Sequence, residues 1–287
     1  MMEKTVYKKD IFYLINKYSK GISRIESEML LEYLFNCNRV DLYTKDLAVN
    51  EVAEELYGSL VGRWLGGEPV QYITGKAEFM GFDFMVTRDT LIPRPETELL
   101  VNEVISFASS LELGALSLLD LCTGSGNIAI SLAKSMPQAE IAATDISGPA
   151  LRIAEKNAIL HNVSGRIRFY EGDLFEALMF DKNQKFDIIV CNPPYIKEAD
   201  FIYLQKEVRL DPRIALNGGK DGLDFYRKIF IGAPAHLIKG GYLLMEIGFG
   251  QRERIRALIE GFKGFELIDV KEDQYLIDRV IVAKWIN

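Results

Sequence analysis

The chain contains 287 residues, carries a formal net charge of −7 at pH 7, and is 48% hydrophobic. Its length predicts one large domain plus a smaller one, and its acidity disfavours binding of duplex DNA or RNA through the phosphates. Apolar runs stop short of the ~18 residues that a transmembrane helix needs, and the N-terminus lacks an apolar signal segment, so we expect a cytoplasmic protein with no membrane partner.

Helical signals dominate the first part of the chain. Ser23 and Glu26 have the spacing of a capping box, and apolar residues follow at helical spacing. A second helix is predicted to begin at Asn50 and to end at Gly66-Gly67. Its apolar face is expected to consist of Val52, Leu56, Leu60 and Trp64. We therefore predict a small helical domain over residues 1–73.

The pattern changes to strand signals after this domain. Aromatic and β-branched residues with Gly75 and Gly81 between them predict a β-hairpin connector over residues 74–92. From residue 93 to 287, short apolar runs alternate with helical segments, which specifies an α/β fold with a parallel sheet covered on both faces. The last two apolar runs, FELIDV and RVIVAKW, lack a convincing helix between them, so we expect them to close the sheet as a hairpin.

A glycine-rich loop follows the apolar run LSLLDL directly, and a helix begins after it. Its residues are Cys122, Thr123, Gly124, Ser125 and Gly126. Glycines at such a place let the backbone turn sharply and approach a ligand closely. The spacing also fits a G-x-G-x-x-A dinucleotide fingerprint, so the loop alone leaves NAD, or a glycine turn without a ligand, as alternatives.

Two acidic residues follow the next two strands at the carboxyl edge of the predicted sheet. Asp145 ends the run EIAATD, where a carboxylate can accept hydrogen bonds from a ribose diol. Asp173 ends RIRFYEGD, and with Leu174 beside it suits an adenine ring and its exocyclic amine. Asp173 can equally be a helix N-cap.

The segment Asn192-Pro193-Pro194-Tyr195 favours methyl transfer over other chemistry. Two prolines fix φ and remove backbone donors, which leaves a stiff segment with outward carbonyl oxygens. An amide nitrogen is a poor nucleophile, so its two protons must be held, and the Asn192 side-chain oxygen and the Pro193 carbonyl supply two acceptors. Tyr195 offers a flat face for a planar amide or base. A structural interpretation, in which the segment only ends a strand, remains open.

The sequence resembles the release-factor glutamine methyltransferases, the HemK or PrmC family, over essentially its whole length. The motifs that carry this resemblance are EPVQYITGKAEFMG, TLIPRPETELL, DLCTGSGNIAISLA, FDIIVCNPPYI and LDPRIALNGGKDGLDFYRKI. The resemblance implies a Rossmann-like class I methyltransferase domain with a seven-stranded, mostly parallel sheet whose last strand is antiparallel. It also implies methylation at N5 of the glutamine in the Gly-Gly-Gln motif of bacterial class 1 peptide-chain release factors.

The same resemblance assigns roles to the residues singled out above. S-adenosylmethionine, which becomes S-adenosylhomocysteine, would lie against the loop from Cys122 to Gly126, with Asp145 at the ribose and Asp173 and Leu174 at the adenine. Asn192, also beside the cofactor, would hold the glutamine with Pro193, Pro194 and Tyr195, and Asn192, Pro193 and Tyr195 would be the catalytic group. The N-terminal helical domain would recognise the release factor, although a stabilising role is the alternative.

Three other functions compete with this interpretation. A sister family methylates a ribosomal protein with the same tetrapeptide, but the segment Arg94 to Glu98 favours the release factor. Adenine-N6 methyltransferases of DNA also use the tetrapeptide, but they need a basic cleft, so we expect no direct nucleic-acid partner. A binding module without catalysis is the third. We expect a monomer, and the three cysteines and two histidines lack ligand spacing, so we expect no metal.

Overall fold

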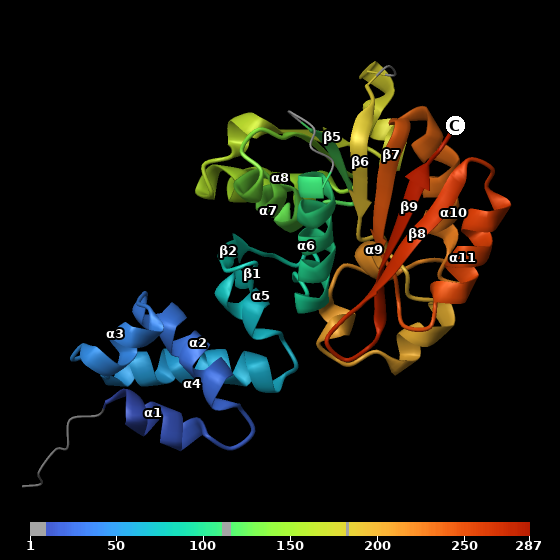
Figure 1. Ribbon diagram of the computed structural model, residues 1–287. Coiled ribbons are helices and arrows are strands. Elements are labelled where there is room, and N and C mark those ends of the chain that lie inside the picture. The colour runs from blue at the N-terminus through green and yellow to red at the C-terminus, as the bar shows by residue number, and fades with distance from the viewer. Residues whose placement is uncertain (1–9, 111–115, 182–183) are drawn as a thin grey trace, which may run out of the picture. The chain divides into compact units, whose positions relative to one another are not determined.

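The computed structural model describes residues 10–110, 116–181 and 184–287. The chain divides into two compact units, one ending at Lys76 and one beginning at Ala77 (Figure 1). The finer division at residues 73 and 92 stays a prediction. In the parts of the chain that are described, no helix has both the length and the apolar character required to cross a membrane.

The N-terminal unit is a set of packed helices. They are α1 (Ile11–Tyr18), α2 (Arg24–Phe35), α3 (Arg39–Thr44), α4 (Glu51–Leu65) and α5 (Val70–Thr74). The capping box is confirmed, because the Ser23 side chain accepts from the Glu26 backbone N–H and the Glu26 side chain accepts from that of Ser23. The helix start at Asn50 is also confirmed, since its side chain accepts from the Ala53 N–H at 2.8 Å.

The predicted apolar face of α4 was wrong for Val52 and Leu56, whereas Leu60 and Trp64 do pack against the core of the unit. Val52 and Leu56 are 63% and 51% exposed, and Leu60 and Trp64 are only partly buried. Tyr57 and Val61 instead face the core of the unit, where the Tyr57 hydroxyl meets Ser27 of α2 at 2.5 Å. Because α4 carries apolar residues on two adjacent stripes, its sequence periodicity does not decide which stripe is buried.

The second unit contains two β-sheets. Strands β1 (Lys76–Phe79) and β2 (Phe82–Met85) form the predicted hairpin. The large sheet has the order β5-β4-β3-β6-β7-β9-β8, in which β9 runs antiparallel to both of its neighbours, β7 and β8, and the other neighbouring strands are parallel. Its strands are β3 (Ser117–Leu121), β4 (Glu140–Asp145), β5 (Ile167–Glu171), β6 (Phe186–Cys191), β7 (Leu237–Glu246), β8 (Phe265–Glu272) and β9 (Asp278–Trp285). The predicted α/β fold and closing hairpin are confirmed.

Helices cover both faces of this sheet (Figure 1). The α-helices of the unit are α6 (Pro95–Ser110), α7 (Asn127–Ser135), α8 (Gly148–Leu160), α9 (Arg213–Leu216), α10 (Asp224–Gly232) and α11 (Arg252–Gly261). Short 3₁₀ turns are η1 (Ser164–Arg166), η2 (Leu174–Asp181), η3 (Glu198–Tyr203), η4 (Val208–Leu210) and η5 (Ala233–Ala235). Alternate residues along each strand point to opposite cores: Leu118 and Val190 pack on the side of α6 and α7, whereas Leu119 and Ile189 pack on the side of α10 and α11.

Candidate active site

The loops at the carboxyl edge of the large sheet enclose a cavity of about 200 Å³. In a doubly wound sheet this edge is where ligands bind, because the loops after adjacent strands converge there. Seven of the residues predicted from the sequence line the cavity. They are Cys122, Gly124, Asp145, Asp173, Leu174, Asn192 and Pro194.

The glycine loop owes its shape to a buried carboxylate at the end of β3. Asp120 Oδ2 accepts from the Thr123 hydroxyl at 2.6 Å and from the Ala129 N–H at 3.2 Å. Burial raises the pKa of Asp120 to about 7, although these two hydrogen bonds oppose the shift. The Thr123 side chain therefore faces the interior, and Ser125 is buried as well, so neither side chain lines the cavity.

Gly126 serves helix packing at the end of the same loop. It has φ +80°, and a Cβ there would lie 3.0 Å from the side chain of Ile130 and 3.1 Å from that of Ala154. A side chain at this position would thus be strained by its backbone and would also press on α7 and α8. The residue brings the helix N-terminus close to the sheet edge rather than lining the cavity.

Asp145 connects the glycine loop to the cavity. Its Oδ2 accepts from the Gly124 N–H at 2.8 Å and its Oδ1 from the Ser147 N–H at 2.9 Å. Burial raises the pKa of this carboxyl, and the backbone hydrogen bonds lower it. Each carboxylate oxygen has two lone pairs, so each can accept a further hydrogen bond from a ligand in the cavity.

Asp173 and Leu174 line another part of the cavity. Leu174 is buried with φ +52°, and Asp173 Oδ2 accepts from the Lys228 ammonium at 2.6 Å. Lys228, Ile146 and Phe225 also line the cavity and were not predicted. Ile146 directly follows Asp145, which was a usable signal, whereas nothing in the local sequence marks the other two.

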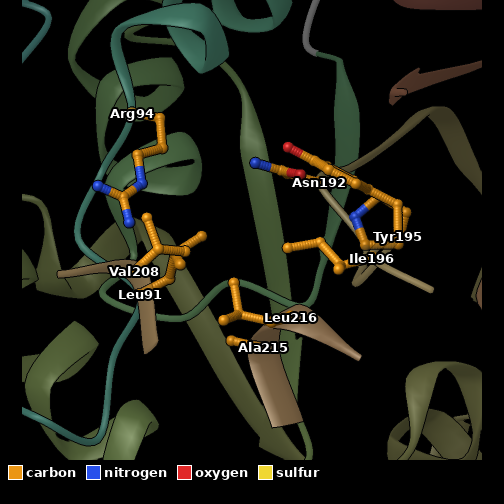
Figure 2. A pocket seen from close by; sticks show the side chains of 9 residues that line it. Leu91, Arg94, Asn192, Tyr195, Ile196, Val208, Ala215 and Leu216 are labelled. Carbon is orange, nitrogen blue, oxygen red and sulfur yellow. The ribbon is translucent and has the colours of Figure 1, made fainter. Parts of the chain in front are cut away.

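A second cavity of about 100 Å³ lies against the first, and Leu91, Asn192 and Ala215 line both. Figure 2 shows Asn192 and Tyr195 on one side of this second cavity and Arg94 and Val208 on the other. Arg94 forms an ion pair with the buried carboxylate of Asp211. Asn192 therefore stands at the border between two cavities, one lined by the predicted cofactor residues.

A chain of hydrogen bonds to residues outside the two cavities holds the Asn192 side chain in place. Its Nδ2 donates to the Thr97 hydroxyl oxygen at 3.0 Å, and the Thr97 hydroxyl donates to Glu246 Oε2 at 2.6 Å. The Tyr195 hydroxyl donates to Glu246 Oε1 at 3.3 Å. Burial raises the pKa of Glu246 to about 7, and burial together with the Glu246 charge raises the pKa of Tyr195.

Thr97 was singled out only as part of the segment Arg94 to Glu98, without a role of its own, and Glu246 was not predicted. Thr97 lies within the quoted segment TLIPRPETELL, and Glu246 ends the apolar run of β7 at the ligand-binding edge. A carboxylate at the end of a buried strand was a signal of the same kind as Asp145. The hydrogen bond between the two joins residues 149 positions apart, which the sequence does not reveal.

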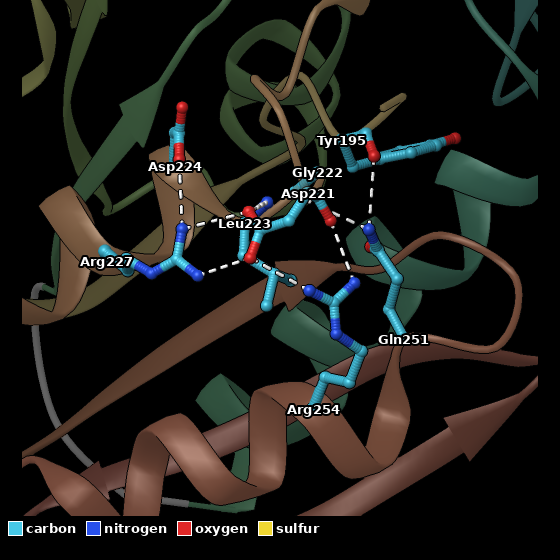
Figure 3. A network of polar contacts seen from close by, with 8 residues as sticks. All are labelled: Tyr195, Asp221, Gly222, Leu223, Asp224, Arg227, Gln251 and Arg254. Atoms are coloured by element: carbon cyan, nitrogen blue, oxygen red, sulfur yellow. Dashed lines mark hydrogen bonds and ion pairs between the residues drawn. The ribbon is translucent and has the colours of Figure 1, made fainter. Parts of the chain in front are cut away.

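The backbone of the Asn192-to-Tyr195 segment is supported by Gln251 (Figure 3). Its Nε2 donates to the carbonyls of Tyr195 and Gly222, both at 3.1 Å, and its Oε1 accepts from the Gly248 N–H at 2.9 Å. Beside it, Asp221 accepts from Arg227 and Arg254, and the hydrogen bond from Arg227, helped by the charges of both arginines, lowers the pKa of Asp221 to about 2. Gln251 is thus hydrogen-bonded to three loops, those that contain Tyr195, Gly222 and Gly248.

The backbone next to Tyr195 also pairs with the glycine-containing loop after α9. The Ile196 N–H donates to the Leu216 carbonyl at 2.9 Å, and the Gly218 N–H donates to the Ile196 carbonyl at 2.8 Å. A Cβ at Gly218 would lie 2.7 Å from the Tyr195 Cα. The loop can approach this closely only because residue 218 has no side chain.

Known proteins resemble this chain in sequence and in fold. The family described as "Methyltransferase small domain" matches residues 97–207, and the family described as "PrmC N-terminal domain" matches residues 14–75. A crystal structure of a methyltransferase from Pyrococcus furiosus has a TM-score of 0.53 at 18% identity, covering 79% of this chain and 98% of that one. The strand order and the site at the sheet edge define a class I methyltransferase.

Two relatives at higher identity define the family more narrowly. A release factor glutamine methyltransferase of Geobacter sulfurreducens is 42% identical over 91% of this chain and 90% of its own length. One of Bordetella pertussis is 41% identical over 91% of this chain and 94% of its own length. The protein belongs to the release factor glutamine methyltransferase family, as the sequence motifs predicted.

Proposed function

We propose that the protein transfers a methyl group from S-adenosylmethionine to the side-chain amide nitrogen N5 of the glutamine in the Gly-Gly-Gln motif of class 1 release factors. The observation that carries this proposal is the position of Asn192 at the border of two cavities. Its amide nitrogen is held by Thr97, so its carbonyl oxygen is directed away from Thr97 and can serve as an acceptor. The names of the 37–42% identical relatives support the release factor as substrate.

The residues that line the larger cavity are chemically suited to bind the proposed cofactor. Asp145 has acceptor capacity left for two ribose hydroxyls, Leu174 offers an apolar wall for the adenine, and Gly124 exposes backbone to the methionine end. When bound, S-adenosylmethionine supplies a methyl group whose bond to sulfur breaks, with its electron pair left on sulfur, as the bond to nitrogen forms. Thr123, Ser125 and Gly126 contribute by shaping the loop.

The smaller cavity would receive the glutamine side chain. The two amide protons need two acceptors, and Asn192 Oδ1 and the Pro193 carbonyl oxygen are suited to this task. Tyr195, which lines the same cavity, would lie against the planar amide. The chain needs no strong base, because the nitrogen loses its extra proton to water only after it has gained the methyl group. Positioning is the main contribution of these residues.

The partner we propose is the release factor itself, recognised in part by the N-terminal helical unit. The match of residues 14–75 to the PrmC N-terminal domain supports a family-specific role for this unit. A substrate that acts in translation would place the enzyme in the cytoplasm. We further propose that the enzyme works as a monomer and without a metal ion.

Incubation with S-adenosylmethionine labelled in the methyl group tests the proposal. We expect label on a class 1 release factor and none on the same factor with the Gly-Gly-Gln glutamine changed to alanine, which is the matched control. Label on duplex DNA or on a ribosomal protein instead of the release factor would overturn the proposed substrate. Absence of label on all three substrates, with cofactor binding retained, would indicate a binding module.

A further inference from the structure

The orientation of the Asn192 amide depends on a directional chain of hydrogen bonds. An ionised Glu246 can only accept, so the single hydroxyl proton of Thr97 must point to Glu246 Oε2, 2.6 Å away. The Thr97 oxygen is then left as an acceptor, and the Asn192 group that can donate to it is the NH₂, at 3.0 Å. The Asn192 carbonyl oxygen must therefore face away from Thr97.

We infer that Thr97 and Glu246 are positioning residues that fix which end of the Asn192 amide is presented to the substrate. This inference rests on the proposed function, in which the Asn192 oxygen accepts a proton of the substrate amide. With the amide flipped, two NH₂ groups would face each other and the acceptor would be lost. Neither Thr97 nor Glu246 lines either cavity, so they act through Asn192.

Protonation of Glu246 would remove this directionality. A protonated carboxyl can donate to the Thr97 oxygen, which frees the Thr97 proton to turn toward Asn192 and stabilise the flipped amide. Glu246 is 1% exposed, and its burial, opposed by its hydrogen bonds, raises its pKa to about 7. The inference thus predicts that transfer falls as the pH is lowered through about 7.

Several other charged or titratable groups face Glu246. Arg279 of β9 lowers the pKa of Glu246, and Glu96 of α6 raises it. Arg279 is itself paired with Asp273, at 2.8 Å. The Tyr195 hydroxyl donates to the Glu246 side chain, and the hydroxyl of Tyr226, on α10, donates to its backbone carbonyl at 2.9 Å. Both tyrosines have raised pKa values, so Glu246 is the group in this cluster that titrates near neutrality.

Substitutions of Thr97 distinguish its effect on the orientation of the Asn192 amide from its contribution to packing. Thr97→Val keeps the shape and removes the hydroxyl, so we expect kcat for release factor methylation to fall by about 10- to 100-fold. Thr97→Ser keeps the hydroxyl and should restore kcat to within about threefold of wild type. Cofactor affinity by calorimetry should stay within about threefold in both variants, since Thr97 is outside the cofactor cavity.

Thr144→Val is the matched control for these variants. Thr144 is fully buried on β4, and among the described residues its hydroxyl has no hydrogen-bond partner. Thr144→Val therefore makes the same side-chain change in the same unit and leaves the hydrogen bonds from Glu246 through Thr97 to Asn192 intact. We expect wild-type kcat from this variant. Equal kcat in Thr97→Val and Thr144→Val would overturn the inference.

The pH profile tests the role of Glu246. Wild-type kcat should rise about tenfold between pH 6 and pH 8 if only the ionised form directs the amide. Glu246→Gln cannot ionise, so its kcat should be lower than that of wild type at pH 8 and should lose the step near pH 7. A step that persists unchanged in Glu246→Gln would overturn this part of the inference.

Failure of the inference can be told apart from failure of the proposed function. The substrate is decided by the wild-type enzyme alone, through label on the release factor, the ribosomal protein or DNA. The positioning roles are decided by ratios between variants on whichever substrate the wild type accepts, since each of these substrates offers an NH₂ group. If the wild-type enzyme labelled DNA, and Thr97→Val lowered kcat on DNA by the expected factor, only the proposed function would be refuted.

Discussion

At the scale of single residues, the proposed function depends most directly on Asn192, which lines both cavities. We expect Asn192→Ala to lower kcat by at least about 100-fold, because one of two acceptors for the substrate amide is lost. Cofactor affinity should change by less than about threefold, since Asp145 and the glycine loop are untouched. Labelled-methyl transfer and calorimetry measure the two quantities, and full activity in the variant would contradict the proposed role.

Asp145 is expected to give the opposite pattern. Asp145→Ala removes acceptors for the ribose and the bond to the Gly124 N–H, and hydrogen bonds to charged groups contribute about 1.5–3 kcal/mol each. Cofactor affinity should fall by roughly 10- to 100-fold in calorimetry. The control is Asp187→Ala, because Asp187 also accepts from a backbone N–H, that of Ser117 at 2.8 Å, at the start of β3. Equal cofactor affinity in the two variants would reject the assignment.

Some cavity-lining residues were predictable because their position in the fold is set by their place in the sequence. Asp145 ends an apolar strand and Asn192 follows one, and in a parallel sheet the strand ends converge. Thr97 and Lys228 lie on helices, so their part in the site depends on how those helices pack on the sheet. Packing of side chains from distant segments is not encoded in local spacing, which is why these residues were missed.

At the scale of elements, the alternation of short apolar runs with helical segments predicted the sheet well. The strands of this sheet are buried on both faces, so they appear as continuous apolar runs whose order along the chain was clear. The helix α4 was harder, because apolar residues occupy both an exposed and a buried stripe. A strand that is buried on both faces can be predicted without deciding which face is buried, whereas for an amphipathic helix the buried face must be predicted as well.

The loop after α9 provides a prediction at this scale. Gly218→Ala would place a Cβ 2.7 Å from the Tyr195 Cα, so the Asn192-to-Tyr195 segment must shift. We expect a loss of about 1–3 kcal/mol in the free energy of unfolding and at least a tenfold lower kcat. The control Gly165→Ala adds a Cβ that meets nothing within 4 Å. Urea unfolding and transfer assays compare the two, and indistinguishable variants would contradict the packing argument.

At the scale of the whole molecule, the large sheet brings the two cavities and the carboxyl group of Glu246 to one edge. The loop after β3 and the acid after β4 border one cavity, the segment after β6 separates the two cavities, and the end of β7 supplies Glu246. Two carboxyl groups, Asp120 and Glu246, are buried there with raised pKa values. Such groups favour function at a cost in stability at neutral pH.

This cost gives the stability of the protein a predictable pH dependence. The pKa of Glu246 rises from 4.5 to about 7 on folding, so between these values the folded state binds more protons than the unfolded one. Its contribution to stability is therefore present at low pH and declines as the pH rises through this window. Glu246→Gln lacks this decline because its side chain does not ionise.

We therefore expect the free energy of unfolding of Glu246→Gln, relative to wild type, to increase by roughly 2–3 kcal/mol between pH 5 and pH 8. Taking the difference between the two proteins cancels Asp120, whose raised pKa acts in the same direction in both. Urea unfolding at the two pH values measures the difference. A difference that is constant with pH would mean that folding does not raise the pKa of Glu246, and the pH dependence inferred for transfer would then lose its basis.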